Sequence, residues 1–500
     1  MRLLDPGFPL FPSRLFKGFT VLLLAGFIWT AWAPAAWAQK QTEDPQQPRR
    51  GFWAAAQAPG DTLDAYSGSL WGPLPARDDS VSAHFANRSR PGWETAVMVP
   101  YWIVGIPFRI VYLGLDQAIV GMDKLGLFGA AAEYPGIKVP GGAYLMPTMS
   151  IGDITGFTLG VDVTRPHFLG PDNLLFLQAS RSTRQADLLS GGTLFNLGSG
   201  WSVQVGGGYE EKNLVRYYGL GPDSYYGDKS YYMRTTTWGG FELDKEVWEK
   251  TGFELLTYFS RVQAREPVYE VDQSLGRVHA DDLPYGYPGE SNGWTSRFAL
   301  YRDNTDQRGR PSRGGFQSAA VSLFTASDGS DLQYLTYHAN IERYHKLWFT
   351  DRTLALRGFF NRLSNVGTSE IPFSRLVTFQ RPDELRGFSS LRFYGMGSLG
   401  FSAEYRWPVW VARGRDDMGV DAYLFTDIGQ VFDKTKEISI ENLRGTGGVG
   451  LRLVNSDRGF GARFELGFSD EQTVVRLKFS QTFQYDPKGI LYGKNPTRFY

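Results

Sequence analysis

The chain has 500 residues with 52 basic and 52 acidic side chains, so its formal net charge is zero. This balance excludes the positive surplus by which proteins bind nucleic acid, and the absence of cysteine excludes disulfides, thiolate metal sites and cysteine nucleophiles. Aromatic residues make up 15% of the chain and glycine occupies 59 positions, while the mean hydropathy is −0.29. Helical membrane proteins are more apolar, whereas transmembrane β-barrels combine alternating strands, aromatic girdles and glycine-rich turns.

The first 38 residues have the pattern of a secretory signal peptide. Arg14 and Lys17 precede an apolar run at 19–28, and Ala36-Trp37-Ala38 provides the small side chains that signal peptidase accepts. An uncleaved anchor is the alternative, but the run is shorter than the roughly 20 residues that span a bilayer. We predict cleavage after Ala38 and export, and no later window is apolar enough for a transmembrane helix.

Two segments separate this signal from the rest of the chain. Residues 39–106 are rich in Pro, Ala, Gly and Asp without periodicity, which predicts a flexible periplasmic lead. Residues 107–128 place apolar side chains at three- and four-residue spacing, which predicts one amphipathic helix. Either this helix docks on an apolar protein surface, or it lies in the membrane interface or caps the mouth of a barrel.

From residue 150 to residue 483 the hydrophobic period is two. In Val475-Arg476-Leu477-Lys478-Phe479, for example, charged and apolar side chains alternate. The segments run for about ten residues or more, the length that crosses a membrane when tilted, whereas strands of soluble sheets are usually shorter. The pattern predicts an all-β fold, a transmembrane antiparallel β-barrel closed so that no edge meets lipid. A polar tail follows at 484–500.

The number of strands is left between fourteen and sixteen, because 265–292 or 366–381 could hide further strands. The fourteen segments with clear alternation lie near 152–164, 172–185, 199–211, 231–245, 250–263, 293–302, 315–326, 332–345, 352–361, 397–408, 418–429, 445–454, 459–468 and 473–483.

One tripeptide, Arg386-Gly387-Phe388, lies in a long irregular stretch five strands before the end of the predicted barrel. Alternation places Glu404 on the polar face of the next strand and Asp427 beside it one strand later. A guanidinium in a partly hydrated lumen is stabilised by carboxylates that accept paired hydrogen bonds. Glu404 and Asp427 are therefore suited to hold an arginine that enters the lumen and to fix its loop to the inner wall.

These residues resemble the BamA/TamA family of outer-membrane barrels, part of the bacterial surface antigen superfamily. In that family an Arg-Gly-Phe or Arg-Gly-Tyr motif lies on a long extracellular loop that folds into the lumen, five strands from the C-terminus, and acidic groups on the next two strands hold its arginine. The resemblance implies that Arg386 binds Glu404 and Asp427 and that this contact fixes the loop to the inner wall. Weaker similarities lie in 217–223 and in the Asp-rich hairpin 301–315. The resemblance covers roughly 150–483 and implies the outer membrane of a Gram-negative bacterium.

The resemblance also implies a function: insertion or translocation of proteins, or of lipids, without cofactor, metal or nucleic acid. A weak seam between the first and last strands, here 153–163 and 473–483, would open to template a client strand. Family members that handle proteins usually carry POTRA domains, and 39–150 shows no βααββ pattern. We therefore expect a barrel that contacts outer-membrane lipid and lipopolysaccharide, receives unfolded outer-membrane protein clients, and works with separate accessory subunits.

Two other functions compete with this one. In a passive pore, inward charges would line an aqueous channel and bias its ion selectivity. In an enzyme, His338 and Asn340 share a face of one strand, but neither a nucleophile-elbow motif nor a metal-spaced histidine cluster accompanies them. We therefore predict no enzymatic activity. The candidate lumen-lining charges are Arg452, Arg463, Glu465, Arg476 and Lys478.

Overall fold

A computed structural model describes residues 137–152, 154–307, 310–347, 352–379, 384–411, 418–455 and 461–478. The predicted signal peptide (1–38), flexible lead (39–106), amphipathic helix (107–128) and polar tail (484–500) lie outside these residues. Within the described part of the chain, no helix is long and apolar enough to cross a membrane.

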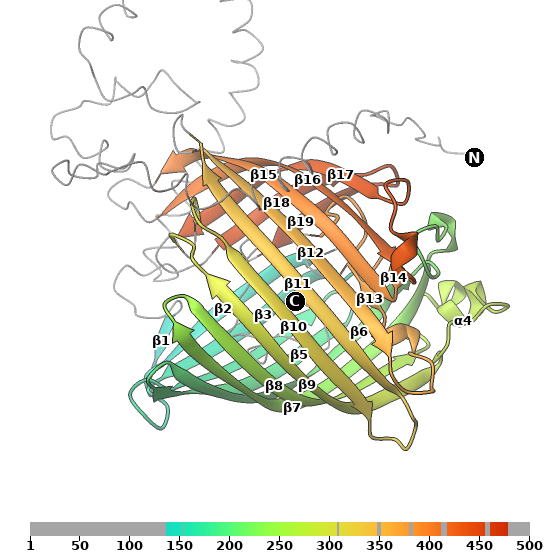
Figure 1. Ribbon diagram of the computed structural model, residues 1–500, viewed down its shortest axis with the longest axis horizontal. Coiled ribbons are helices and arrows are strands. Elements are labelled where there is room, and N and C mark those ends of the chain that lie inside the picture. The colour runs from blue at the N-terminus through green and yellow to red at the C-terminus, as the bar shows by residue number, and fades with distance from the viewer. Residues whose placement is uncertain are drawn as a thin grey trace, which may run out of the picture.

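Sixteen antiparallel strands close into one barrel, which Figure 1 shows with all strands steeply tilted. Each barrel strand pairs with the next along the chain, and the last strand, β19 (Thr473–Lys478), pairs back on the first, β2 (Ala143–Gly152). A short additional strand, β1 (Ile137–Val139), pairs with the beginning of β2. The predicted all-β transmembrane barrel is therefore confirmed, with the larger of the expected strand numbers.

The other barrel strands are β3 (Gly156–Pro166), β4 (Leu174–Ser182), β5 (Ala186–Gly198), β6 (Trp201–Tyr217), β7 (Ser230–Trp248), β8 (Thr251–Arg265), β9 (Gly289–Asp303), β10 (Phe316–Ala326), β11 (Gln333–Lys346), β12 (Thr353–Asn365), β15 (Gly397–Val411), β16 (Met418–Phe432), β17 (Arg444–Asn455) and β18 (Gly461–Phe468). The connections hold the short helices η4 (Tyr226–Asp228), η5 (Val271–Gln273), α4 (Leu275–Val278), η6 (Phe373–Arg375) and η7 (Thr435–Glu437), and the paired β13 (Val377–Thr378) and β14 (Tyr394–Gly395).

The two strands that the sequence did not reveal are β2 and β5, and not segments of 265–292 or 366–381. Pro147 interrupts the pattern of β2, and Leu188-Leu189 with Gly191-Gly192 breaks the alternation of β5. The predicted first strand, 152–164, is β3, the second strand of the barrel. The prediction of 153–163 as one side of the seam is therefore wrong, because β2 occupies that place.

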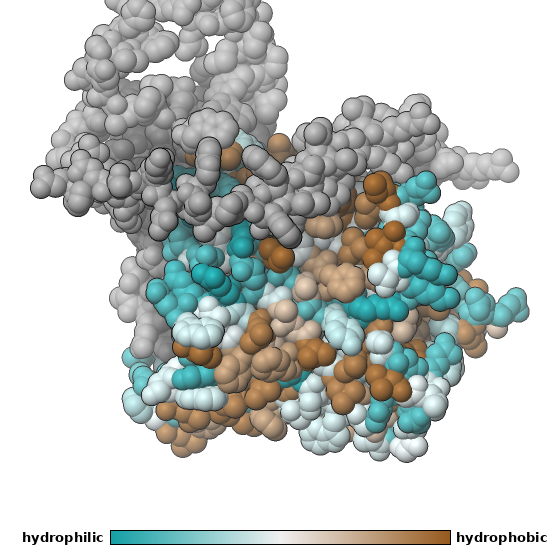
Figure 2. Space-filling model, in the orientation of Figure 1, coloured by the Kyte–Doolittle hydropathy of each residue, from teal (hydrophilic) through white to brown (hydrophobic). Residues whose placement is uncertain are grey.

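The two faces of the sheet differ in polarity. In β11, His338, Asn340 and Glu342 are buried, whereas the alternate side chains Tyr337 and Ile341 are exposed. Figure 2 shows such hydrophobic side chains, in brown, spread over the outer surface of the strands. An apolar exterior around a polar interior is the arrangement that a lipid bilayer requires.

The connections alternate between two ends of the barrel. We call the end that carries the long connections 218–229, 266–288, 366–396 and 433–443 the loop end. The opposite end, where β2 begins, we call the terminal end; there the longest described connection is 304–315. In Figure 1, α4 stands at the rim of the loop end.

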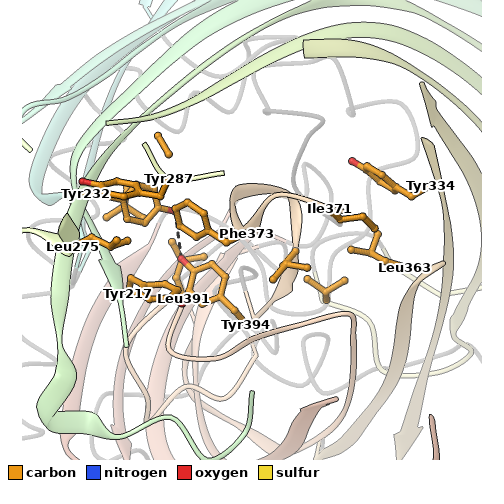
Figure 3. Close-up of a cluster of buried hydrophobic side chains, with 14 of the residues drawn as sticks. Tyr217, Tyr232, Leu275, Tyr287, Tyr334, Leu363, Ile371, Phe373, Leu391 and Tyr394 are labelled. Atoms are coloured by element: carbon orange, nitrogen blue, oxygen red, sulfur yellow. Dashed lines mark hydrogen bonds between the residues drawn. The ribbon is translucent and has the colours of Figure 1, made fainter. Parts of the chain in front are cut away.

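The connection 366–396 folds inward and packs against the wall. Figure 3 shows Phe373 among the aromatic side chains of Tyr217, Tyr232, Tyr287 and Tyr394. The ring centroid of Phe373 lies 5.5 Å from that of Tyr217 and 5.1 Å from that of Tyr232, both edge-on. Edge-on aromatic contacts of this kind add to the burial of apolar area. An apolar cluster therefore lies inside the loop end of the barrel.

Candidate functional site in the barrel lumen

The tripeptide at 386–388 begins with a tight turn inside the connection 366–396. The amide of Phe388 donates a hydrogen bond to the carbonyl of Leu385 at 2.9 Å. Leu385 has a φ of +43°, a conformation that side chains other than glycine adopt rarely. The turn directs the side chain of Arg386, which is 1% exposed, toward the inner wall.

Arg386 meets the carboxylates of three strands. Its Nη2 and Nε lie 2.6 Å and 3.0 Å from the two carboxylate oxygens of Asp427 on β16, a bidentate pair. Its Nη1 lies 2.5 Å from Oε1 of Glu404 on β15 and 3.2 Å from Oε1 of Glu465 on β18. The structure thus places both acids expected from the sequence on this guanidinium, and adds Glu465, which had been assigned to the lumen lining.

Further groups balance the charge of these acids. Arg406 donates to Oε2 of Glu404 at 2.7 Å, and the hydroxyl of Tyr423 donates to Glu465 at 2.9 Å. The guanidinium carbon of Arg386 lies 3.7 Å from the ring centroid of Phe425, a cation–π contact. Burial opposes the charge of Arg386, but the surrounding carboxylates hold its pKa well above its usual value.

Gly387 is required because two backbones approach closely at this point. A Cβ at Gly387 would collide with the carbonyl of Phe468 on β18, and a Cβ at Gly467 would collide with the carbonyl of Arg386. Phe388 is 1% exposed and packs edge-on against Phe393, with ring centroids 5.3 Å apart. Each residue of the tripeptide therefore has its own physical role: ion pairing, close approach and apolar anchoring.

The last two strands also hold this turn. Arg476 on β19 donates to the carbonyls of Arg386 and Phe388 at 2.7 Å and 2.8 Å. Ser469, between β18 and β19, donates to the carbonyl of Gly387 at 2.8 Å. Arg476, expected to line a channel, is instead buried beneath the loop.

The remaining candidate lumen-lining residues either lie close to acidic side chains or have a side chain that the structure does not describe. Arg452 donates to Asp421 at 2.8 Å, and Asp421 also binds Arg310 from the connection 304–315, at 2.7 Å. Arg463 lies 3.7 Å from Glu465. Lys478 is the last residue of β19, and its side chain lies outside the described ones.

His338 and Asn340 have partners typical of wall residues. Nδ1 of His338 lies 2.6 Å from Oδ1 of Asn361, and Oδ1 of Asn340 accepts a hydrogen bond from Arg357 at 2.8 Å. Across the described ranges no group of three His, Cys, Asp or Glu side chains is placed to hold a metal ion.

Three site residues were not assigned to the arginine from the sequence: Glu465, Arg406 and Arg476. A signal for them exists in the alternation. Arg406 lies two residues after Glu404 and so shares its face, and Glu465 is the direct cross-strand partner of Arg476. Charged residues at alternate positions on successive strands would have predicted the extended network.

Comparison with known proteins supports the family resemblance that the sequence motifs indicated. Residues 148–483 match the model of the Omp85 superfamily domain. Among solved structures, the chain is similar to BamA from Haemophilus ducreyi lacking POTRA domains 1–3, at 15% identity and a TM-score of 0.50, with 73% of this chain and 77% of that chain covered. No curated protein matches the chain.

Two further solved structures are similar. These are CdiB from Acinetobacter baumannii (12% identity, TM-score 0.44, covering 67% of this chain and 59% of that chain) and CdiB from Escherichia coli (11%, 0.47, 70% and 63%). The chain thus spans less than two thirds of either CdiB chain.

The family match settles the relationship that the sequence motifs indicated. The resemblance to the BamA/TamA family is confirmed, whereas the expected absence of POTRA domains concerns residues that lie mostly outside the described ones. Because the matched segment covers more than half of the sequence, this chain belongs to the Omp85 superfamily of outer-membrane β-barrels.

Proposed function

We propose that this barrel inserts or translocates polypeptides, or lipids, at the outer membrane, with the loop locked to the wall by Arg386 bound to Glu404 and Asp427. The observation that carries the proposal is the position of the Arg386 turn. Its guanidinium is held by the inner wall, while its carbonyl accepts a hydrogen bond from Arg476 on the last strand. The loop is thereby coupled to the strand that closes the barrel.

The seam between β19 and β2 is the proposed place of opening. Their described pairing includes Leu477 and Ile151. Opening this seam would expose the edge of β2 to a client strand, which would add by main-chain hydrogen bonds. The seam strands proposed here are β2, in place of 153–163, and β19, which lies within the predicted 473–483.

The proposed partners follow from this role. Unfolded outer-membrane proteins would be the clients, separate accessory subunits would deliver them, and lipid with lipopolysaccharide would surround the exposed apolar wall. Export would depend on the signal peptide at 1–38. The proposal includes no nucleic acid, no cofactor and no catalytic step.

A passive pore remains the alternative function. The buried apolar cluster around Phe373 and the pairing of Arg452 with Asp421 favour a plugged barrel instead, because a pore wall presents hydrated charges to a water column. A plugged barrel would show low conductance in planar bilayers.

The test reconstitutes the purified barrel in vesicles and measures how fast an unfolded outer-membrane protein folds into them. Wild type should accelerate folding, and Arg386→Gln should lose most of the acceleration. Arg277→Gln is a control, because Arg277 pairs with Asp272 on the exposed rim, away from the lumen. Equal folding rates with wild type and with empty vesicles, together with a large stable conductance, would reject the proposal and favour the pore.

A further inference from the structure

The connection 218–229, between β6 and β7, reaches across the mouth of the loop end. Tyr226 of this connection contacts Gln472 of the hairpin 469–472, between β18 and β19. Arg392 joins Ser224 of the connection to Glu471 of the same hairpin. Strands β2 to β5 occupy the wall between these two anchor points, joined at this end by short turns, and the seam between β19 and β2 lies within that sector. The contacts between the connection and the hairpin therefore bridge the two sides of the seam.

Arg392, which is 2% exposed, links the two sides. Its Nε and Nη2 each lie 2.8 Å from a carboxylate oxygen of Glu471 in the hairpin. On the other side, its Nη1 and Nη2 donate to the hydroxyl and the carbonyl of Ser224, both at 2.7 Å. Tyr218 and Phe393 lie against the guanidinium, each ring centroid 4.6 Å from its carbon. Four of the five N–H groups of this guanidinium thus donate hydrogen bonds, to groups on opposite sides of the seam.

Further links parallel this one, and among them Arg444 on β17 donates to the carbonyl of Pro222 at 2.8 Å. The hydroxyl of Tyr226 donates to Gln472 at 3.3 Å. The hydroxyl of Ser389 accepts hydrogen bonds from Arg216 on β6 at 2.9 Å and from Gln472 at 2.8 Å. The links that end on the hairpin 469–472 form what we call the clasp: Ser224, Tyr226, Ser389, Arg392, Glu471 and Gln472.

The Arg386 site does not connect the two sides of the seam in this way. Its partners Glu404, Asp427, Glu465 and Arg476 belong to β15, β16, β18 and β19, all on the side of the last strand. Separation of β19 from β2 could carry this whole site along intact. A restraint on separation at the loop end must therefore come from contacts that bridge to the side of the first strand.

We propose that the clasp is this restraint: it holds the loop end of the seam closed and must release before β2 and β19 separate there. The role of the clasp in activity rests on the proposed function, whereas the contacts that form it do not depend on that function. Moving the hairpin 469–472 away from β2 draws Glu471 away from Ser224, and Arg392 can follow only one of them. Breaking charge-assisted hydrogen bonds of a buried guanidinium opposes that movement.

The experiment measures hydrogen exchange of backbone amides in the full-length barrel in detergent, by mass spectrometry of peptides that cover β2 and β19. When the barrel opens and closes locally faster than the exposed amides exchange, the observed exchange rate is proportional to the equilibrium constant of local opening. Arg392→Gln and Glu471→Gln should each speed exchange of the seam peptides by about tenfold or more, because each removes hydrogen bonds to a charged group. Peptides from β11 and β12, several strands away from the seam, should keep the wild-type rate.

The matched control is Arg375→Gln. Arg375 is a buried arginine of the same connection, but it donates to Ser260 on β8 and to Ser291 on β9, away from the seam. This variant should leave the seam peptides at the wild-type rate. Heat-modifiable migration on gels identifies any variant that fails to fold, and Tyr226→Phe, which removes a single hydroxyl, then serves as the milder probe with a smaller acceleration.

The outcomes separate the clasp from the proposed function. Seam exchange that is unchanged in the folded clasp variants, or raised equally by Arg375→Gln, overturns the clasp whatever those variants do in the folding assay. Faster seam exchange confined to the clasp variants supports it. If the same variants leave client folding unaffected, the clasp is supported, but the proposal that the seam templates client strands is rejected.

Discussion

Replacing Arg386 by methionine should release the loop from the lumen. The change leaves Asp427, Glu404 and Glu465 buried together, each at most 1% exposed, without the cation that lies between them. Breaking a buried ion pair by removing one partner costs about 3–5 kcal/mol. Because these side chains are at most 1% exposed, solvent screens their interaction only weakly. If this cost reduces the free energy of loop docking by the same amount, the undocked population rises about a hundredfold or more.

Limited chymotrypsin digestion measures this population, because the protease cleaves after aromatic side chains such as Phe388 and Phe393, which are both buried in the docked loop. When opening and closing are fast, the cleavage rate follows the open population. Arg386→Met should therefore be cut near residue 388 at least tens of times faster than wild type, and Arg386→Lys should lie between the two. Cleavage of Arg386→Met at the wild-type rate, in a barrel that still shows heat-modifiable migration, would refute the ion-pair account of docking.

Three further predictions follow from the same geometry. Gly387→Ala should undock the loop and speed the same cleavage without any change of charge, because its methyl group would collide with the carbonyl of Phe468; wild-type cleavage would show that the two backbones can move apart cheaply. Arg310→Gln and Asp421→Asn should give a coupling free energy of about 1 kcal/mol or more in a double-mutant cycle on urea unfolding, whereas strict additivity would mean that the hairpin 304–315 is not anchored there. Leu159→Lys, at an outward position 56% exposed, should destabilise the barrel in lipid by about 2–4 kcal/mol, measured by unfolding from vesicles, and a neutral effect would place this position outside the hydrocarbon core.

The alternation of side chains predicted much of the fold and the centre of the site. Period two identifies both the strands and their inward faces, so Glu404 and Asp427 could be assigned to the lumen before their contacts with Arg386 were known. It failed at β2 and β5, where proline and paired glycines interrupt the pattern. Because β2 begins the barrel, this gap displaced the predicted seam by one strand.

The clasp could not have been predicted by the same reasoning. Arg392 and Ser224 are 168 residues apart, and Arg392 and Glu471 are 79 residues apart, and all three lie in irregular connections without periodicity. Their meeting depends on how the connection 218–229 crosses the closed barrel, which is a consequence of strand number and tilt. The Tyr217-to-Asp223 similarity marked this connection but gave no partner for it.

The ion-paired Arg386 and Arg392 of the clasp lie on the same connection, 366–396. Arg386 fixes it to strands β15, β16, β18 and β19. Arg392, six positions later, joins it to the hairpin 469–472 and to the connection 218–229. Undocking of Arg386 would therefore strain the clasp directly. We expect the Arg386→Met variant to exchange its seam amides faster as well, as a consequence of loop release.

The central claim, that the seam between β2 and β19 opens during function, is tested most directly by closing it covalently. The chain contains no cysteine, so Ile151→Cys with Leu477→Cys introduces a single pair at directly opposed positions, and opposed residues of antiparallel strands lie within disulfide range. The account predicts that the oxidised barrel no longer accelerates client folding and that reduction restores the activity. Full activity with the disulfide formed would contradict it.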